Sequence, residues 1–460
     1  MKRKIAVMCV LAALGAFAEV TFTNVLVRQR WPWSPKIDVY YTVKGVDGWT
    51  GVRPVFAAGG ETLAAPEESL SGDRTISSDG CFRLTWNPAA ANLGRERLNG
   101  LTVSLGSSAG PLYMIVDLAK ERGADGQITY VWEDDLRAGK WGTWEENPYS
   151  YISSVIWTGV TENMCYKTNS LVLRYVPPTT SASWKAHTGG ADTFLMGAPE
   201  GTPAGQGART EDKSSVEAHI AEVSGVTRCQ PQQTVRLTKG YWMGVFEVTQ
   251  GQWDMMGLEN PSYWTAEREA RPVETLSLAA IRGDASGFYW PENGHVVDPA
   301  SFLGLLRART GIQFDLPTEA QWEFAARAGA TDIRYGAQTY EGLKATARCW
   351  WQRWNYTDPA GGPESGGPAL VGSYRPNAWG LYDTMGNVAE RCVNLWVGNY
   401  NDPANGGDDP PGPASGSTRC GAYRGGEFYN YIDLCSLPER REWQYDARKY
   451  GYEGFRVCAE

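Results

Sequence analysis

The segment Leu316-Pro317-Thr318-Glu319-Ala320-Gln321-Trp322-Glu323-Phe324-Ala325-Ala326-Arg327 carries the strongest structural signal in this 460-residue sequence. Thr318 and Gln321 stand three residues apart and form the pattern of a capping box, in which each side chain binds the other residue's backbone amide. Apolar side chains then recur at four-residue spacing at Ala320, Phe324 and Ala328, as they do along one face of a helix. The segment therefore predicts a helix that is capped by Thr318 and packs on a core.

Two further segments carry helix signals. Thr249 to Met256 opens with a second capping box, formed by Thr249 and Gln252. Another helix is expected to begin at Asp298-Pro299, a capping residue followed by proline, and to end at Gly311. Long stretches rich in Gly and Pro separate these signals, so we expect a loop-rich domain with few helices.

The first part of the chain has a different pattern. Hydrophobic and polar residues alternate from Ile37 to Val43 and from Leu101 to Leu105, and this period of two is typical of strands. Tyr113 to Leu118 and Leu171 to Val176 are further predicted strands. We expect residues 19–177 to form an all-β sandwich module.

A stiff, polar stretch, Pro177 to Ser183, follows the last of these strands. Such a stretch suits a domain boundary, and a chain of 460 residues is expected to hold more than one core. The sequence thus predicts an α+β protein with a signal peptide at 1–18, a β-sandwich module at 19–177, a linker at 178–192 and a second domain at 193–460.

The N-terminus has the pattern of a secretory signal peptide. Lys2, Arg3 and Lys4 precede a short apolar run, and Ala16-Phe17-Ala18 supplies a small-residue cleavage site. The run is too short to span a bilayer, and no other segment approaches the length required. We expect a secreted or periplasmic protein without a transmembrane segment.

The charge balance bears on the kind of partner. The formal net charge is −9, whereas binding to a phosphate backbone depends on clustered Lys and Arg. The sequence therefore argues against nucleic acid as a partner.

Several short motifs follow one another after residue 190. In chain order they are Phe194-Leu195-Met196-Gly197, Gly240 to Thr249, Arg271-Pro272-Val273-Glu274, Leu316 to Arg327, Pro376 to Asp383, Gly386-Asn387-Val388, Tyr423-Arg424-Gly425-Gly426 and Gly454-Phe455-Arg456-Val457. This collinear set resembles the formylglycine-generating enzyme (sulfatase-modifying factor) family over about residues 190–460. The resemblance implies a variant C-type-lectin-like fold for the second domain.

The resemblance also implies a place for catalysis. Oxidases of the family convert a sulfatase cysteine into formylglycine with oxygen and with copper held by two cysteines after the Gly-Gly turn, and soft thiolates suit Cu(I). In this sequence the first of those positions falls on Asn430 and the second on Cys435. If the chain is an active oxidase, copper is its cofactor and Cys435 is its catalytic residue, but the two-cysteine set is incomplete at position 430.

A calcium loop is the second implication of the resemblance. The spacing of Asp383, Gly386, Val388 and Glu390 matches the structural calcium site of the family, with two carboxylates and two backbone carbonyls as ligands. The alternative is that both carboxylates accept hydrogen bonds from loop amides. We expect structural calcium.

The predicted export favours disulfides among the cysteines that remain after the signal peptide. We expect Cys435 to be part of a disulfide or a buried thiol, and not a metal or redox group. Cys392 is the preferred partner because both residues lie beside family motifs, and Cys420 and Cys458 are the alternatives.

Aromatic and polar residues gather where the family places its peptide-binding cleft. The aromatic ones are Trp350, Trp351, Trp354, Tyr429, Tyr431, Trp443, Tyr445 and Tyr452. Tyr429, Asn430, Tyr431, Arg440 and Trp443 are the predicted cleft residues, because aromatic side chains give large contact area together with a polar group. The alternative is that many of them belong to the core.

These observations favour an exported accessory or binding scaffold for a polypeptide or glycan. One alternative is a formylglycine-generating oxidase that acts on sulfatases, with a second ligand from Cys420. The other is a structural, surface-assembly or hypervariable ligand-display protein.

Overall fold

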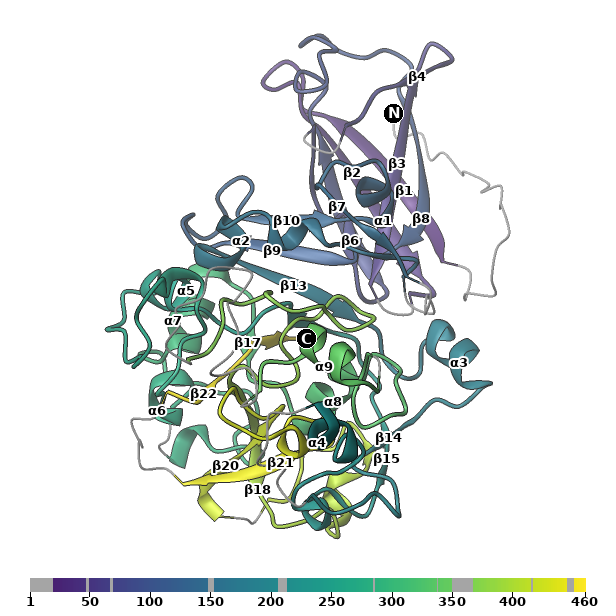
Figure 1. Ribbon diagram of the computed structural model, residues 1–460. Coiled ribbons are helices and arrows are strands. Elements are labelled where there is room, and N and C mark those ends of the chain that lie inside the picture. The colour runs from purple at the N-terminus through teal and green to yellow at the C-terminus, as the bar shows by residue number, and fades with distance from the viewer. Residues whose placement is uncertain are drawn as a thin grey trace. The chain divides into compact units, whose positions relative to one another are not determined.

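The structure is a computed structural model that describes residues 20–46, 49–66, 69–147, 153–205, 213–283, 286–336, 338–349, 367–414, 417–444 and 451–460. The predicted signal peptide lies outside these ranges. The chain divides into two compact units between Pro111 and Leu112. Figure 1 shows the strands of the first unit in purple and blue and the mixed second unit in teal to yellow.

The first unit is built from strands in two sheets. One has the order β1-β2-β7-β5, and in the other β3 pairs with β4, β6 and β8. The strands are β1 Thr21–Gln29, β2 Ile37–Lys44, β3 Thr50–Ala58, β4 Glu61–Leu63, β5 Leu70–Gly72, β6 Thr75–Ile76, β7 Gly80–Trp86 and β8 Thr102–Ala109. The alternation in β2 places Ile37, Val39 and Tyr41 in a core where Phe56 stacks on Trp86 at 4.1 Å. The two sheets therefore share one apolar interior.

The second unit contains the remaining sheets, of which the largest has the order β10-β9-β13-β16-β23-β17. Its strands are β9 Tyr113–Asp117, β10 Ile128–Val131, β13 Ser170–Val176, β16 Tyr241–Gly244, β17 Phe314–Asp315 and β23 Cys458–Ala459. The smaller sheets hold β11 Glu145–Glu146, β12 Val155–Ile156, β14 Phe194–Met196, β15 Gln233–Arg236, β18 Ala389–Trp396, β19 Gly407–Asp408, β20 Ser417–Arg424, β21 Arg440–Gln444 and β22 Glu453–Gly454.

The helices of the second unit are short. They are α1 Glu133–Arg137, α2 Cys165–Thr168, α3 Ala182–Thr188, α4 Lys213–Ala218, α5 Gln250–Asp254, α6 Leu278–Ile281, α7 Phe302–Thr310, α8 Glu319–Arg327 and α9 Tyr340–Thr346. Single 3₁₀ turns include η3 Val226–Cys229, η7 Pro403–Asn405 and η8 Ile432–Leu434. A mixed, loop-rich domain is therefore confirmed, whereas the lectin-like description stays a prediction.

The capping box predicted for α8 is present. Gln321 N donates to Thr318 Oγ1 at 3.1 Å, and Thr318 N donates to Gln321 Oε1 at 2.9 Å. The helix is buried along its whole length, and Phe324 packs edge-on against Trp184 and Trp379. The capping box of α5, formed by Thr249 and Gln252, is present as well.

Two local predictions are wrong. Helix α7 is capped by Ser301, whose Oγ accepts the amide of Gly304 at 3.2 Å, and Asp298 instead accepts the amide of Ala300 in the preceding turn. The predicted linker 178–192 contains α3, which buries Trp184 against Phe324. A capping residue followed by an apolar anchor was the sequence signal for that helix.

The division of the chain differs from the predicted boundary at residue 177. Strand β13 lies before that boundary but pairs with β16 from Leu173 to Val176, and β9 pairs with β13. These hydrogen-bonded neighbours tie residues 113–176 to the second unit. In the described parts of the chain, none of the helices has the length and apolar composition needed to cross a bilayer.

Candidate functional site

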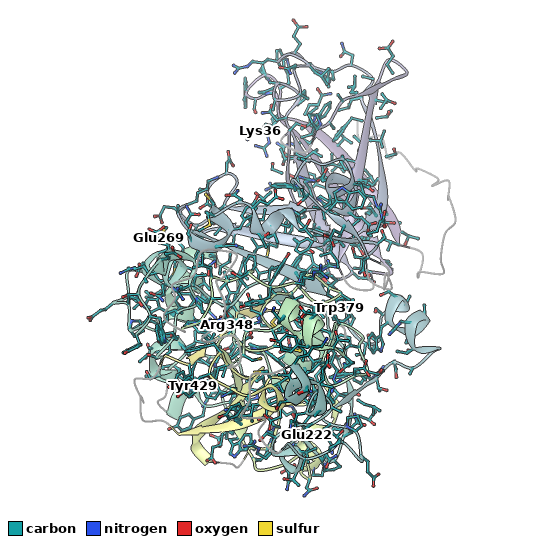
Figure 2. The ribbon with its side chains drawn as sticks, in the orientation of Figure 1. Lys36, Glu222, Glu269, Arg348, Trp379 and Tyr429 are labelled. Carbon is teal, nitrogen blue, oxygen red and sulfur yellow. The ribbon has the colours of Figure 1, made fainter. Side chains whose placement is uncertain are left out.

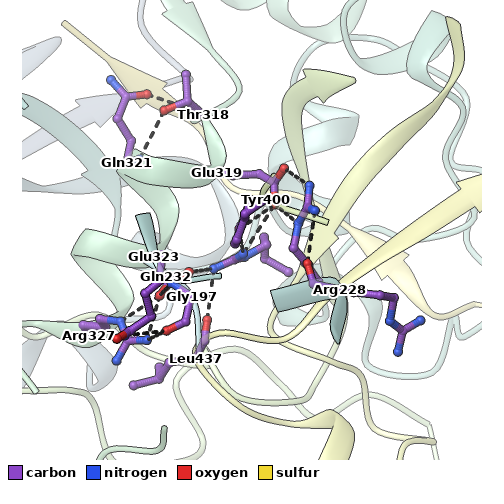
Figure 3. Close-up of polar contacts among 12 residues, drawn as sticks. Gly197, Arg228, Gln232, Thr318, Glu319, Gln321, Glu323, Arg327, Tyr400 and Leu437 are labelled. Carbon is purple, nitrogen blue, oxygen red and sulfur yellow. Dashed lines mark hydrogen bonds and ion pairs between the residues drawn. The ribbon is translucent and has the colours of Figure 1, made fainter. Parts of the chain in front are cut away.

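A buried network of arginines and glutamates supports the region where the predicted site residues lie (Figure 3). Both carboxylate oxygens of Glu319 accept from Arg440, at 2.6 and 2.7 Å, and Arg424 bridges Glu319 and Glu323. Burial would raise the pKa of Glu319, but Arg440 and Arg424 together hold that pKa below its usual value. We call Glu319, Glu323, Arg424 and Arg440 the paired network.

Arg440 was predicted to line the cleft, but it is a member of the paired network. Arg440 is buried, and its guanidinium also lies 4.2 Å from the ring of Tyr400 and 4.5 Å from that of Trp396. A buried guanidinium that is paired with Glu319 and packed against two rings is unavailable to a ligand. Arg440 therefore belongs to the scaffold and not to a cleft.

The Gly-Gly turn leads directly into the loop that carries Asn430 and Cys435. Gly425 and Gly426 both have positive φ, and a Cβ at Gly426 would lie 2.4 Å from the carbonyl of Leu434 and 3.0 Å from Cys435 Sγ. Glycine is required here because the backbone approaches closely and has a left-handed conformation. The turn thereby packs the loop back on Cys435.

Both polar atoms of the Asn430 amide form hydrogen bonds, with Glu427 of the same loop and with Arg441 of β21. Its Oδ1 accepts from the backbone of Glu427 at 3.2 Å and from the guanidinium of Arg441, and its Nδ2 donates to Glu427 Oε1. The second oxygen of Glu427 accepts the amide of Tyr429 at 2.7 Å. Asn430 is thus a buried residue whose amide holds the loop together.

Cys435 follows η8 and does not pair with Cys392. Among the seven cysteines whose side chains the structure describes, no disulfide is formed, and Cys392, Cys435 and Cys458 are all buried thiols. The Cys435 thiol contacts the carbonyls of Glu427 and Asn430 at 3.7 and 4.0 Å and hydrogen-bonds the thiol of Cys349. The predicted Cys392–Cys435 pairing is therefore not observed, because the neighbouring sulfur comes from another segment.

Five aromatic side chains form a continuous group beside this loop, and we call them the aromatic ledge. Its members are Tyr263, Trp264, Phe428, Tyr429 and Tyr452. Tyr429 stacks on Tyr452 with centroids 5.5 Å apart, and Phe428 joins Tyr452 to Trp264 at 5.7 and 5.9 Å. Tyr263 is 64% exposed and Tyr429 is 38% exposed, so two rings of the ledge face solvent. Tyr429 is labelled in Figure 2 near the yellow C-terminal strands.

Glycines hold the centre of the ledge in place. A Cβ at Gly367 or at Gly451 would lie 2.6 Å from the indole of Trp264. Both backbones therefore lie against the indole, an approach that only glycine allows.

Three buried carboxylates lie beneath the ledge, and we call Glu274, Glu427 and Glu453 the acidic trio. Glu274 accepts the amide of Trp264 at 2.8 Å and the hydroxyl of Thr275 at 2.6 Å. Burial raises the pKa of all three, to about 7 for Glu427 and about 8 for Glu453, where the charges of Glu427 and Glu274 add to the effect. The acidic trio thus carries less negative charge at neutral pH than three ordinary glutamates would.

The predicted calcium ligands lie close together, but they are engaged differently. Glu390 forms a bidentate pair with Arg456, and its Oε2 also accepts from Trp322 Nε1 at 2.7 Å. Asp383 Oδ2 accepts the amide of Gly372 at 2.6 Å, whereas its Oδ1 is buried without a hydrogen-bond partner among the described residues. Burial raises the pKa of Asp383 to about 6. The unpartnered Oδ1 fits a cation, and Glu390 has one oxygen lone pair left for it.

The structure places the remaining predicted residues as follows. Tyr431 is partly exposed and precedes η8. The side chains of Cys420 and Trp443, and all of Trp350, Trp351, Trp354 and Tyr445, lie outside what the structure describes. Two surface hollows of about 400 and 450 Å³ lie elsewhere, near Tyr40 in the first unit and near Arg122 in the second.

Sequence reasoning missed several members of this region. Cys349, Arg441, Glu274 and Glu453 come from separate segments that only the fold brings together. Tyr263-Trp264, an aromatic pair followed by the Arg271-Pro272-Val273-Glu274 motif, was a signal that could have pointed to the ledge.

The second unit is similar in sequence to proteins of known family. The sequence profile of the sulfatase-modifying factor enzyme 1-like domain matches residues 200–460. The formylglycine-generating enzyme of Streptomyces coelicolor is 37% identical over 127 residues, which are 26% of this chain and 38% of that protein. The chaperone protein LppX of Paenibacillus barcinonensis is 28% identical over 191 residues, 36% of this chain and 65% of that one. Among solved structures, the Treponema denticola variable protein 1 superposes with a TM-score of 0.41 at 23% identity, covering 63% of this chain and 95% of that chain.

Proposed function

The chain belongs to the sulfatase-modifying factor enzyme 1-like family through residues 200–460, and from that premise we propose that it is an accessory protein that binds a polypeptide or glycan on its aromatic ledge. The observation that carries the proposal is the ledge itself, in which Tyr263 and Tyr429 expose their rings next to the loop of Asn430. At the position of the first family cysteine stands a buried amide that already holds Glu427 and Arg441.

The ledge has the composition of a binding surface. Tyrosine and tryptophan rings give large contact area at low conformational cost and keep a polar group for hydrogen bonding. Trp264 and Phe428 are fixed by close packing, so the exposed rings of Tyr263 and Tyr429 are supported from below. A preorganised surface of this kind loses little entropy when a ligand binds.

A binding screen tests this proposal. The purified protein is applied to a glycan array and to a phage-displayed peptide library, and hits are measured by calorimetry. Tyr429→Ala and Tyr263→Ala are each expected to weaken a hit roughly tenfold or more, as truncation of an aromatic anchor does.

The matched control is Trp33→Ala, because Trp33 is 89% exposed but lies in the first unit. It should leave binding unchanged. The proposal would be overturned if the ligand bound both tyrosine variants with wild-type affinity. It would also be overturned if neither library contained a ligand.

Formylglycine formation is the second candidate function, and the contact between Cys349 and Cys435 favours it. Mass spectrometry of a Cys-x-Pro-x-Arg peptide incubated with the protein, copper, oxygen and a thiol reductant tests it, with an active family member as control. Aldehyde product would establish an oxidase. No product while the control works would exclude that activity for this peptide class.

We also propose that calcium binds at Asp383, with the carbonyls of Gly386 and Val388 and one lone pair of Glu390 as further ligands. The support is the buried, unpartnered Oδ1 of Asp383. The chemistry that calcium supplies there is structural, since it would neutralise a buried carboxylate and fix the loop.

Export is proposed from the signal-like N-terminus, and N-terminal sequencing of the protein recovered from the periplasm or medium tests it. The formal charge of −9 supports a ligand other than nucleic acid. We also propose that the second domain has a lectin-like fold. The strands of the first unit would then serve as a partner domain or as a spacer.

A further inference from the structure

The connection between β1 and β2 exposes two tryptophan rings on the surface of the first unit. It comprises residues 30–36, and we call it the tryptophan turn. Trp33 is 89% exposed, the highest value among the large hydrophobic side chains that the structure describes, and Trp31 is 46% exposed. Single exposed apolar residues are ordinary, but two large rings exposed within three residues of each other are typical of an interaction surface.

Hydrogen bonds within the tryptophan turn fix its backbone. The amides of Trp33 and Ser34 donate to the carbonyl of Arg30, at 3.1 and 3.3 Å. The amide of Arg30 donates to the carbonyl of Lys36 at 3.0 Å. The guanidinium of Arg30 donates to both carboxylate oxygens of Asp38, at 2.7 and 2.8 Å. Because these contacts already order the turn, a surface that binds it loses little conformational entropy.

The tryptophan turn is basic, although the chain as a whole is acidic. Arg28, Arg30 and Lys36 lie in or beside the turn, and the sequence from Val20 to Lys36 contains no Asp or Glu, whereas the formal net charge of the chain is −9. Arg28 and Lys36 are exposed, and Arg30 is paired with Asp38. Exposed charges further away than about 8 Å are largely screened at physiological ionic strength. A surface at the turn therefore meets the local positive charge and not the net negative charge.

We infer that the tryptophan turn binds the surface of a lipid bilayer that contains anionic phospholipid. An indole ring suits the boundary between headgroups and acyl chains, because its body is apolar and its N–H can still form a hydrogen bond. The charges of Arg28 and Lys36 complement the phosphate groups beside the rings. A neutral glycan would also stack on the indoles, but it would leave both cations without a counterpart.

Flotation of the full chain with large unilamellar vesicles tests the inference. Vesicles of phosphatidylcholine alone are compared with vesicles that also contain phosphatidylglycerol. We expect binding to the anionic vesicles to be at least roughly tenfold stronger and to weaken as salt is added. Trp31→Ala and Trp33→Ala should each weaken it roughly tenfold, and Lys36→Gln should weaken it roughly fivefold.

The matched controls are Val55→Ala and Lys44→Gln, because both side chains are exposed in the first unit but lie outside the tryptophan turn. Both variants should bind vesicles like the wild type. The inference would be overturned by equal binding to the two kinds of vesicle, by binding to neither, or by wild-type affinity in both tryptophan variants.

Hydrogen exchange of the wild-type protein provides a readout that does not depend on how the variants fold. Anionic vesicles should slow the exchange of amides in residues 30–36, whereas phosphatidylcholine vesicles should leave it unchanged. Protection that appears only in other segments would overturn the inference.

The inference goes beyond the ligand proposed for the aromatic ledge and can fail separately from it, because the two surfaces belong to different units. The peptide and glycan libraries contain no lipid, so Trp33→Ala remains a valid control for the ledge. A library ligand without vesicle binding would keep the proposed function and overturn the inference, and vesicle binding without a library ligand would do the reverse.

Discussion

Glu319 and Glu453 are equally hidden from solvent, at 3% and 4% exposure, yet their pKa values move in opposite directions. Arg440 and Arg424 outweigh burial at Glu319 and lower its pKa, whereas burial dominates at Glu453 and raises its pKa to about 8. At these two residues, pairing with arginine and not burial alone decides whether the carboxyl group is charged. Glu319 belongs to the paired network of the scaffold, whereas Glu453 lies beneath the aromatic ledge.

The largest expected effect comes from breaking the paired network. Glu319→Ala leaves the buried guanidinium of Arg440 without its bidentate partner and should lower the free energy of unfolding by about 3–5 kcal/mol. Urea denaturation measures the change. A loss below about 1 kcal/mol would show that the network is no more important for stability than a surface ion pair.

Asp383 is intermediate between the paired and the underpaired buried acids, because one of its carboxylate oxygens has a hydrogen-bond partner and the other has none among the described residues. Removing calcium tests the role of this residue. Chelation should lower the free energy of unfolding by about 2–3 kcal/mol relative to protein in calcium roughly 100-fold above its dissociation constant. Asp383→Ala should remove this sensitivity. Glu390→Ala is a poorer test because it also breaks the pair with Arg456.

The control for the calcium experiment is Asp254→Ala, which changes a surface aspartate that pairs with Arg268. Its response to chelation should equal that of the wild type. If chelator left the melting temperatures of the wild type, Asp383→Ala and Asp254→Ala unchanged, the calcium proposal would be contradicted.

The pH dependence of stability sharpens the comparison at Glu453. Its pKa of about 8 in the folded protein lies above the ordinary 4.5, so the folded state binds more protons than the unfolded state between these values. The free energy of unfolding should therefore fall as pH rises from 4.5 to 8, by at most about 1.4 kcal/mol per pH unit from this group. Arg391 opposes the shift, and Glu427 and Glu274 favour it.

Glu453→Gln should reduce the fall of the free energy of unfolding with pH, because glutamine does not ionise. The variant should be more stable than the wild type by about 1–2 kcal/mol at pH 8. Chemical denaturation at half-unit pH steps measures it, with Glu319→Gln as the matched change at a paired acid. Parallel curves for the wild type and Glu453→Gln would show that Glu453 is charged throughout, and the contrast with Glu319 would be lost.

The smallest effect is expected at the exposed edge of the ledge. Tyr429→Ala should change the free energy of unfolding by less than about 1 kcal/mol, because its ring is partly exposed and stacks on other members of the ledge. Thermal unfolding measures it. A loss of several kcal/mol would identify Tyr429 as a core residue and weaken the case for a ligand there.

Local signals predicted the elements of the fold better than the connections between them. The capping boxes of α5 and α8 depend on residues three positions apart, so the sequence contains all the information they need. For α7, both Asp298 and Ser301 were competent caps, and only the packing of the preceding turn selects Ser301.

The site was harder to predict because its contacts join distant segments. The motifs located the loop of Asn430 and Cys435, but the direction of the Arg440 side chain in β21 depends on Glu319 in α8. The sulfur beside Cys435 comes from Cys349, and no spacing rule connects the two. Residue types were therefore predictable where the chain is continuous, and partners were not.

The six-stranded sheet has a practical consequence for anyone who truncates this protein for expression. A fragment that starts at residue 193, as the motif match alone would suggest, discards β9, β10 and β13 and removes one of the two hydrogen-bonding neighbours of β16. An open edge of this kind invites pairing with other chains and aggregation. A fragment that starts at Leu112 keeps the sheet whole and is the better choice for crystallisation trials.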